Sequence, residues 1–520
     1  MSATSAAAWL PRAGRRAGGL RAACRAERRK LLAQSSIRVT AMVCVLAPFL
    51  FALLLSTQSG VPGDSLLGVW VHDSGAAAGF VVLDFAGYLG FPVLAGLLAG
   101  DLFASEDRYG TWKVILTRSR SRRELFAAKV LAGCALTCAL ALLAALSSVA
   151  GGLLFVGTGP LAGLGGSLLP SGEAVLLLLG GWVVSLPPLV GLVSLAILLS
   201  VASRSGIVGV LGTVLIGLLM QLLTFLGNGS VAGFALLSTG FDDWHGLLGD
   251  PRFLGPLGLS LAASAIWTAS CLWAAWVLLR RREFAGPPVS ARRGWGALAR
   301  PVLILAVAAV ALGAAARLAP TTVTRARVAG SFGRSFERLT ALQQRELGRP
   351  IPAGARLNMR TRCARRGTAA DGPGEDWSCT LLLAGSASGW NPINLTTITY
   401  DLSVKPNGCY KADAPPSFVG AQTMDTPHGG TVVNPLYEIY GCFDELASSG
   451  CPEAAPCDAL AHRTGPAKPA RTTPAPPERE RELRRLHEAE RAAGPEVIRE
   501  QEEAERRLSR EGSSGAGSSR

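Results

Sequence analysis

The sequence predicts an α-helical polytopic membrane protein that is followed by a small, disulfide-stapled α+β domain outside the membrane. Of the 520 residues, 49% are hydrophobic and only 17% are charged, whereas soluble proteins carry about 25% charged residues. Long apolar runs lie within residues 38–319, and six cysteines gather in a polar region beyond them. These observations together predict membrane spans first and a compact polar domain second.

The apolar runs predict seven transmembrane helices, six that form a core and a seventh that follows it. A helix of about 20 apolar residues crosses the roughly 30 Å hydrocarbon layer of a bilayer. The stretch 1–37 is too long for the charged start of a cleaved signal sequence, so the first run is expected to be a span. The predicted spans lie near residues 38–56, 80–100, 125–155, 174–200, 207–227, 256–279 and 301–319.

The distribution of Lys and Arg predicts the orientation of these spans. The segments 1–37, 101–124, 201–206 and 280–300 together carry 21 basic residues, whereas the intervening loops carry Arg252 alone. Basic loops stay in the cytoplasm. The N-terminus is therefore expected to be cytoplasmic in the cell membrane, and the C-terminal domain extracytoplasmic. The net charge of +14 follows this topology, so no nucleic-acid partner is expected.

Six of the eleven cysteines predict a disulfide framework in the polar region. They lie within 95 residues of each other, and an even cysteine set in an exported segment is typical of disulfides. The rival interpretation is a zinc site, but no Cys-x-x-Cys pair supports it. We expect near neighbours to pair: Cys363 with Cys379, Cys409 with Cys442, and Cys451 with Cys457.

The polar region also predicts its own secondary structure. Strands are expected at 376–385 and from residue 395, where a Pro-Asn-Gly turn at 406–408 ends "TITYDLSV". The stretch 330–348 has a helical pattern. The proposed organisation is 1–37 (basic interfacial helix), 38–280 (six-span domain), 281–300 (basic cytoplasmic linker), 301–319 (seventh span), 320–465 (extracytoplasmic domain) and 466–520 (Pro-rich, charged, disordered tail).

The segment "SEDRYGTWKVILTRSRSRRELFAAK" (105–129) stands out because it concentrates charge between two apolar runs. Trp112, Ile115 and Leu116 fall at helical spacing and give a short apolar face. Such a helix can lie along the membrane surface or dock on a cytoplasmic partner. From the residues alone, the alternative of a plain positive-inside anchor carries equal weight.

The pattern of this segment resembles the loop between the second and third spans of type-2 ABC exporter membrane subunits. "AERRKLLAQSSIR" (26–38) also resembles the basic interfacial helix that precedes the first span in that family, and 228–255 would correspond to its re-entrant segment. The sequence departs from the family at "TRSRSRR", where a Pro usually precedes Ser-Arg. The matching residues are Glu106, Gly110-Thr111, Leu116-Thr117, Ser121-Arg122 and Lys129. The resemblance would place Glu106, Gly110, Thr111, Trp112, Arg122 and Lys129 in an ATPase-coupling loop.

The resemblance implies a permease subunit of an ATP-binding cassette transporter, with export as the expected direction. The chain would work with a second permease subunit, as a homodimer or heterodimer, and with a cytoplasmic ATPase. No cofactor is expected on this chain, since ATP and Mg²⁺ would bind to the ATPase. "YDLSVKPNGCYKA" in the outer domain is similar to a Tyr-Asp…Gly-Cys pattern of exported actinobacterial domains, which names no activity.

Motif absences agree with a transporter subunit rather than an enzyme. No Gly precedes a Lys, so there is no Walker A phosphate loop, and Gly-x-Ser-x-Gly and His-Glu-x-x-His are also missing. No metal-ligating pair of histidines is found. The alternative function, from a different class, is a membrane-anchored extracytoplasmic binding or sensing protein, although anchoring needs a single span.

Lone polar residues inside the predicted spans have both structural and functional interpretations. Asp84 could be a substrate or proton site, but its place near the outer surface favours snorkelling to the interface. Gln221 is expected either to pack in the core or to hydrogen-bond a neighbouring helix. Pro187 and Pro188 predict a kink or break in the fourth span.

Overall fold

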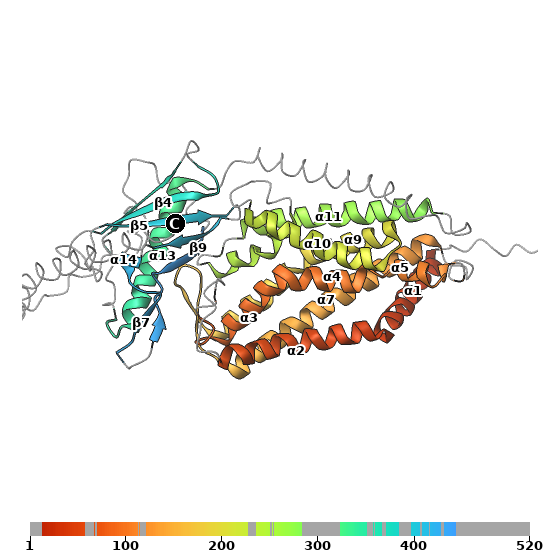
Figure 1. The fold of residues 1–520 in the computed structure, drawn as a ribbon, viewed down its shortest axis with the longest axis horizontal. Helices are drawn as coiled ribbons and strands as arrows, with labels where there is room; N and C mark the ends of the chain where they lie inside the picture. The colour runs from red at the N-terminus through yellow and green to blue at the C-terminus, as the bar shows by residue number, and fades with distance from the viewer. Residues whose placement is uncertain are drawn as a thin grey trace, which may run out of the picture. The chain divides into compact units, whose positions relative to one another are not determined.

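A computed structural model gives the fold of this chain (Figure 1). The predicted seventh span, the tail from residue 466 and the Cys451–Cys457 pair lie outside the described residues. The residues described are 13–57, 67, 70–112, 114, 121–226, 236–249, 252, 254–282, 323–350, 357, 359–366, 371–383, 397–405, 408–414, 416–427 and 431–443.

Six helical stretches in the described part are long and apolar enough to cross a membrane. They agree with the first six predicted spans, and the protein is therefore a multi-pass membrane protein. The N-terminal helix α1 (Ala13–Ala33) precedes them. The stretches are α2 (Ser35–Thr57), Gly75–Arg108, α7 (Arg122–Phe155), Ser171–Ser203, α10 (Gly206–Leu226) and α11 (Gly255–Arg280).

Two of these stretches are interrupted. The second comprises α3 (Gly75–Phe85), the π-helical turn η2 (Ala86–Gly90), α4 (Phe91–Ala99) and the short α5 (Ala104–Arg108). The fourth divides at Ser185 into α8 (Ser171–Val184) and α9 (Leu186–Ser203). The prolines at 187 and 188 lie in the first turn of α9, where a missing N–H is tolerated. The predicted break is thus confirmed.

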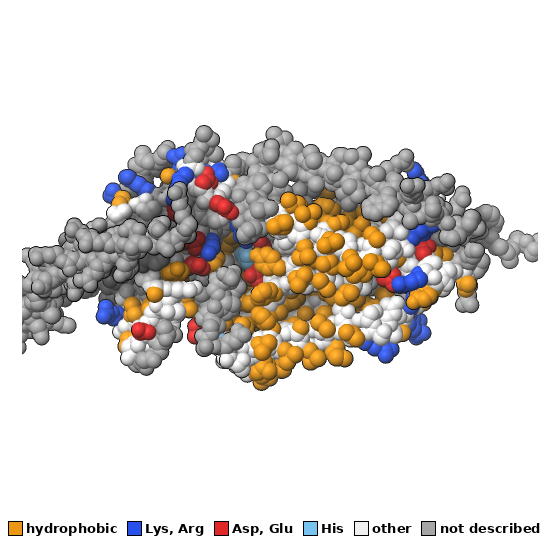
Figure 2. All heavy atoms as spheres, in the orientation of Figure 1, with side chains coloured by type: hydrophobic (Ala, Val, Ile, Leu, Met, Phe, Trp, Pro, Cys, Tyr) orange, Lys and Arg blue, Asp and Glu red, His pale blue; other side chains and the backbone are white. Residues whose placement is uncertain are grey.

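A layer of large apolar side chains faces outward from the helices. Figure 2 shows hydrophobic side chains covering most of the visible helical surface. On α2 and α10 they include Val39, Met42, Ile207, Leu211 and Leu215, each more than half exposed. A soluble protein would not leave so much apolar surface in contact with water. This surface fits contact with lipid.

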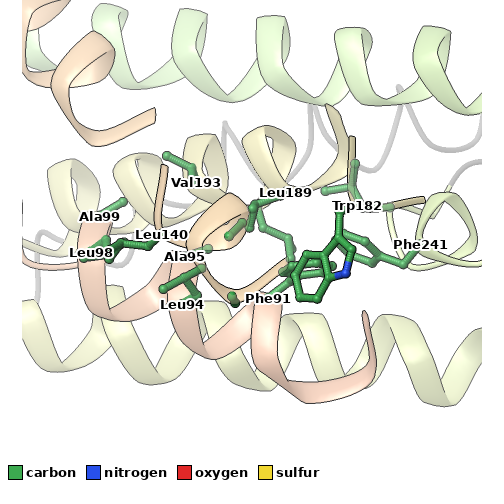
Figure 3. Close-up of a cluster of buried hydrophobic side chains, with 14 of the residues drawn as sticks. Phe91, Leu94, Ala95, Leu98, Ala99, Leu140, Trp182, Leu189, Val193 and Phe241 are labelled. Atoms are coloured by element: carbon green, nitrogen blue, oxygen red, sulfur yellow. The ribbon is translucent and has the colours of Figure 1, made fainter. Parts of the chain in front are cut away.

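Inside the helical part, the core is tightly packed. Figure 3 shows the side chains of α4, among them Phe91, gathered with those of α8 and α9. The ring of Phe91 lies edge-on to Trp182 of α8 at 5.7 Å between centroids. α4 and α10 approach so closely that a Cβ on Gly209 would lie 2.0 Å from the carbonyl oxygen of Gly100. Small residues permit such contact between membrane helices.

The C-terminal described part is an antiparallel sheet with one long helix against it. The sheet order is β3-β4-β5-β6-β9, and α13 (Arg325–Glu346) packs on it through Phe332 and Phe336, whose rings lie 5.2 and 6.0 Å from that of Tyr400. The strands are β3 (Met359–Arg365), β4 (Gly374–Leu383), β5 (Thr397–Val404), β6 (Cys409–Asp413) and β9 (Glu438–Cys442). The α+β prediction is confirmed.

Smaller elements complete the description. The described part also contains two short hairpins, one of β1 with β2 and one of β7 with β8. The described part of the predicted re-entrant segment contains two buried 3-10 helices, η4 (Thr239–Phe241) and η5 (Asp243–Leu248). The remaining elements are β1 (Leu161–Ala162), β2 (Leu168–Leu169), β7 (Thr423–Asp425), β8 (Thr431–Val433) and α14 (Pro416–Val419).

Two disulfides connect neighbouring strands, and both are pairs expected from the sequence. Cys363 of β3 lies directly opposite Cys379 of β4, and the two are bonded. Cys409 of β6 lies opposite Cys442 of β9 and is bonded to it. The second bridge closes the longer loop, with a sequence separation of 33 residues against 16 for the first.

Removal of the longer bridge is expected to destabilise the sheet more than removal of the shorter one. In the chain-entropy model the double variant Cys409→Ala/Cys442→Ala loses about 4 kcal/mol and Cys363→Ala/Cys379→Ala about 3 kcal/mol. Limited proteolysis of the purified chain under non-reducing conditions measures both. Wild-type protein treated with reductant serves as the control and should be at least as sensitive as either variant. Equal resistance of all proteins would contradict the expectation.

Candidate functional site

A buried group of charges lies where the 101–124 segment meets α1 and α7. We call Glu27, Lys30, Glu106, Thr111 and Lys129 the charge cluster. The Lys129 Nζ atom donates to Glu106 Oε1 at 2.8 Å, to Glu27 Oε2 at 3.1 Å and to the carbonyl oxygen of Leu102 at 3.3 Å. Lys129 is fully buried and Glu106 is 1% exposed. A lysine is almost never buried without such partners.

The Glu106 carboxylate also accepts hydrogen bonds from side chains other than Lys129. Lys30 and the Thr111 hydroxyl both donate to the Glu106 carboxylate, and the Thr111 N–H donates to the Glu106 backbone carbonyl at 3.1 Å. Two lysines therefore face two glutamates. Charge-assisted hydrogen bonds of this kind are stronger than neutral ones and fix side-chain geometry. The cluster joins α1, α5, α7 and the turn after α5.

The turn after α5 presents a small exposed surface. Gly110 has a φ of 62°, a left-handed conformation that glycine adopts without strain. Tyr109 beside it is 73% exposed, and Val114 is 54% exposed. Trp112, in contrast, is buried and its ring stacks on that of Phe103 at 6.2 Å between centroids. The turn therefore shows Tyr109 and Gly110 to the outside while Trp112 anchors it.

Of the predicted apolar face, only Trp112 lies in the described part, and it is buried. Helical spacing from Trp112 suggested a surface open to the membrane or a partner, but burial of that side chain removes it from the surface. Its predicted companions, Ile115 and Leu116, lie outside the described residues. The regular helix before the turn is α5, which ends at Arg108. Periodicity could not reveal that Phe103 supplies a ring for the indole to stack on.

The end of α11 is fastened to the same region. Arg122, at the first position of α7, donates to the carbonyl oxygens of Arg280 and Arg282, both at 3.1 Å. A guanidinium at a helix C-terminus satisfies free carbonyls and opposes the negative end of the helix dipole. Arg282 in turn donates to Asp107 Oδ2 at 2.7 Å.

A hydroxyl group on α9 anchors the start of α5. The Oγ atom of Ser200, which is fully buried, accepts hydrogen bonds from the N–H groups of Phe103 and Ala104 at 3.2 and 3.1 Å. Those donors would otherwise lack partners at a helix N-terminus. As a result, α5 is tied to four other helices: α1, α7, α9 and α11.

The structure thus brings the sequence-predicted residues of the 105–129 segment together and adds others. Glu106, Thr111 and Lys129 are in direct contact, whereas Arg122 lies at the end of α11. Sequence reasoning did not single out Glu27, Lys30, Asp107, Ser200 or Arg282. Glu27 and Lys30 lie inside the segment "AERRKLLAQSSIR" that resembles a family helix, and that was the available signal. Nothing local marked Ser200.

The two polar residues predicted inside the spans have partners elsewhere. Gln221 of α10 donates to the Gly87 carbonyl oxygen at 3.0 Å, so it satisfies a group in the π-helical turn of the second span. Asp84 is mostly covered by protein. Its side chain is only 15% exposed, and an oxygen lies 3.9 Å from His245 Nε2.

Comparison with known protein families assigns part of the chain. Residues 23–220 match the model described as ABC-2 family transporter protein. The match runs from α1 to within α10 and contains the whole charge cluster. It supports a permease part of an ABC transporter for this stretch and leaves the sheet region unassigned. No curated protein matches the sequence.

Loss of the buried ammonium should destabilise the helical part strongly. In Lys129→Met, Glu27 and Glu106 would face each other with only the half-exposed Lys30 beside them. Removal of one partner from a buried ion pair costs about 3–5 kcal/mol. The measurement is thermal unfolding of the purified chain in detergent, where a markedly lower midpoint is expected.

The matched control is Arg108→Ala, on α5, the short helix that carries Glu106. Arg108 pairs with Asp101, but their side chains are 56% and 37% exposed, and exposed pairs contribute about 0–1 kcal/mol. Similar unfolding midpoints for Lys129→Met and wild type would show that the cluster does not hold these helices together.

Proposed function

We propose that this chain is the membrane-spanning permease subunit of an ATP-binding cassette transporter that exports its substrate. A separate cytoplasmic ATPase would bind ATP and Mg²⁺ and supply the energy, and a second permease subunit would complete the transport path. The single observation that carries the proposal is the arrangement at α5: an exposed turn is rigidly connected to a buried charge cluster that joins several helices.

The exposed side of the turn is suited to contact a partner. Tyr109 is 73% exposed, and the guanidinium of Arg108 lies 5.4 Å from the centre of its ring. Tyr and Arg are enriched among the residues that dominate protein–protein binding energy. Gly110 adds no side chain, so a partner backbone can approach closely there. This surface is where we place the ATPase.

The buried side of the turn is suited to transmit motion. A displacement of α5 acts on α7 through Glu106 and Lys129, on α11 through Asp107 and Arg282, and on α9 through Ser200. Packed helices with fixed polar contacts shift as rigid elements rather than deform. ATP-driven closure of the partner would thereby rearrange the helices and give alternating access. A protein that only anchored an outer domain would not need such connections.

The proposed orientation places α1 and the 101–124 segment in the cytoplasm. The basic residues at 1–37, 101–124 and 280–300 support it through the positive-inside rule. The two disulfides of the sheet region also support it, because structural disulfides persist in oxidising compartments outside the cytoplasm.

Truncation of the exposed tyrosine should weaken ATPase binding without affecting the fold. We expect Tyr109→Ala to lower the amount of ATPase that co-purifies in mild detergent, with an affinity loss of about tenfold or more, typical of a central interface aromatic. Stimulation of ATP hydrolysis by the permease should fall in parallel. The control is Leu254→Ala. This side chain is 48% exposed and lies immediately before the first residue of α11, at the end of that helix opposite to Arg280. Equal co-purification with both variants would refute the docking role.

Single cysteines should report the topology in intact cells. A membrane-impermeant maleimide is expected to label Thr399→Cys, on an exposed position of β5, and to leave Tyr109→Cys unlabelled until the cells are permeabilised. The parent chain, which has five free cysteines among the described residues, gives the background. The reverse labelling pattern would invert the proposed orientation while leaving the membrane assignment intact.

A further inference from the structure

A second group of ionisable side chains lies far from the charge cluster in sequence and uses different elements. Asp84 of α3, Asp242 after η4 and His245 of η5 each offer one ligand atom, and these atoms all lie within 4.8 Å of one another. We call these three residues the Asp84 site. The His245 Nε2 atom lies 3.9 Å from Asp84 Oδ1.

His245 is held in place without a hydrogen bond to its Nε2 atom. The residue is 5% exposed, and within the part of the chain that the structure describes, this nitrogen has no hydrogen-bond partner. Buried polar atoms normally have one. The imidazole lies 4.2 Å from the ring of Trp244, which in turn stacks on Phe80 at 5.0 Å. Aromatic packing therefore fixes the ring and directs its nitrogen toward the carboxylates.

One basic group already neutralises part of the negative charge of the site. Lys405 Nζ lies 3.2 Å from Asp242 Oδ2, and the Asp242 carboxylate raises the pKa of Lys405. The lysine side chain is 34% exposed, so its ammonium can turn toward solvent. A stronger cation could then take its place beside Asp242.

We propose that Asp84, Asp242 and His245 bind a divalent transition-metal ion of the zinc class. One imidazole and two carboxylates suit Zn²⁺ and similar ions, whereas Mg²⁺ and Ca²⁺ prefer oxygen ligands alone. Zinc ligands lie about 2.1 Å from the ion in a tetrahedral arrangement, so two ligand atoms are about 3.4 Å apart. The three ligand atoms here lie within 4.8 Å of one another, and side-chain rotations that bring them closer together would complete the site.

A metal ion at this position would also change the contacts around the site. The ion would tie α3 to the 236–249 segment and release Lys405 from Asp242. This inference does not depend on the transport function.

Zinc titration of the purified full-length chain tests the site. The protein is stripped with a chelator, and its free thiols are alkylated because free cysteines, of which the described residues include five, would also bind zinc. Wild type is expected to bind one more tight equivalent of Zn²⁺ than His245→Asn, and Mg²⁺ should not compete. Loss of a ligand should weaken this affinity by at least about 100-fold, since loss of an outer-shell partner alone costs 10–100-fold.

Lys405→Gln provides the decisive comparison. If the ammonium competes with the metal, its removal should tighten zinc binding and increase the zinc-dependent rise in melting temperature. Weaker binding in Lys405→Gln, or equal zinc stoichiometry in wild type and a folded His245→Asn, would overturn the proposal. Should His245→Asn fail to fold, Asp84→Asn gives the same comparison with a side chain of nearly the same shape.

Discussion

The ammonium group of Lys129 is the constraint on which the helical part of this structure depends. A fully buried positive charge has a large desolvation cost and persists only where hydrogen-bond acceptors surround it. Glu106, Glu27 and the Leu102 carbonyl oxygen meet that requirement. Because these acceptors come from α5, α1 and the loop before α5, the position of one lysine on α7 fixes three other segments. The geometry of the exposed Tyr109 turn follows from this network.

Inside a bilayer, the lipid tails are as apolar as the helix surfaces, so apolar burial does not favour one helix contact over another. Polar and small residues therefore determine how the helices pack. Gln221 reaches the carbonyl group of Gly87 in the π-helical turn, and Gly100 and Gly209 allow α4 and α10 to touch. The fourth stretch divides at Ser185 into α8 and α9. Each of these features places a helix at a defined position.

The sheet region is stabilised by an apolar core and disulfides rather than by contacts between membrane helices. Its core is built by alternation along β4, where Trp377, Cys379, Leu381 and Leu383 are buried against α13 and neighbouring strands. Two disulfides join directly opposed residues, which suits a small domain with a limited apolar core. The region lies outside the range that matches the transporter family. It also supplies Lys405, which pairs with Asp242 in the segment before α11.

Sequence by itself determined the features that depend on local composition or spacing. Six spans followed from apolar length, the break at Pro187 and Pro188 from the missing N–H groups, and the strand beginning near Thr397 from alternation. The near-neighbour cysteine pairs were also correct for Cys363–Cys379 and Cys409–Cys442.

Tertiary structure alone decided which polar groups meet. Glu27 and Lys129, which are hydrogen-bonded, are separated by 102 positions. Periodicity predicted an exposed Trp112, whereas in the folded structure its ring stacks on that of Phe103. Asp84 and His245 lie far apart in the sequence, and only folding brings their side chains within 4 Å. The physical reason is that helical and strand periods describe neighbours along one element, whereas the partner of a buried charge is chosen by the packing of elements against one another.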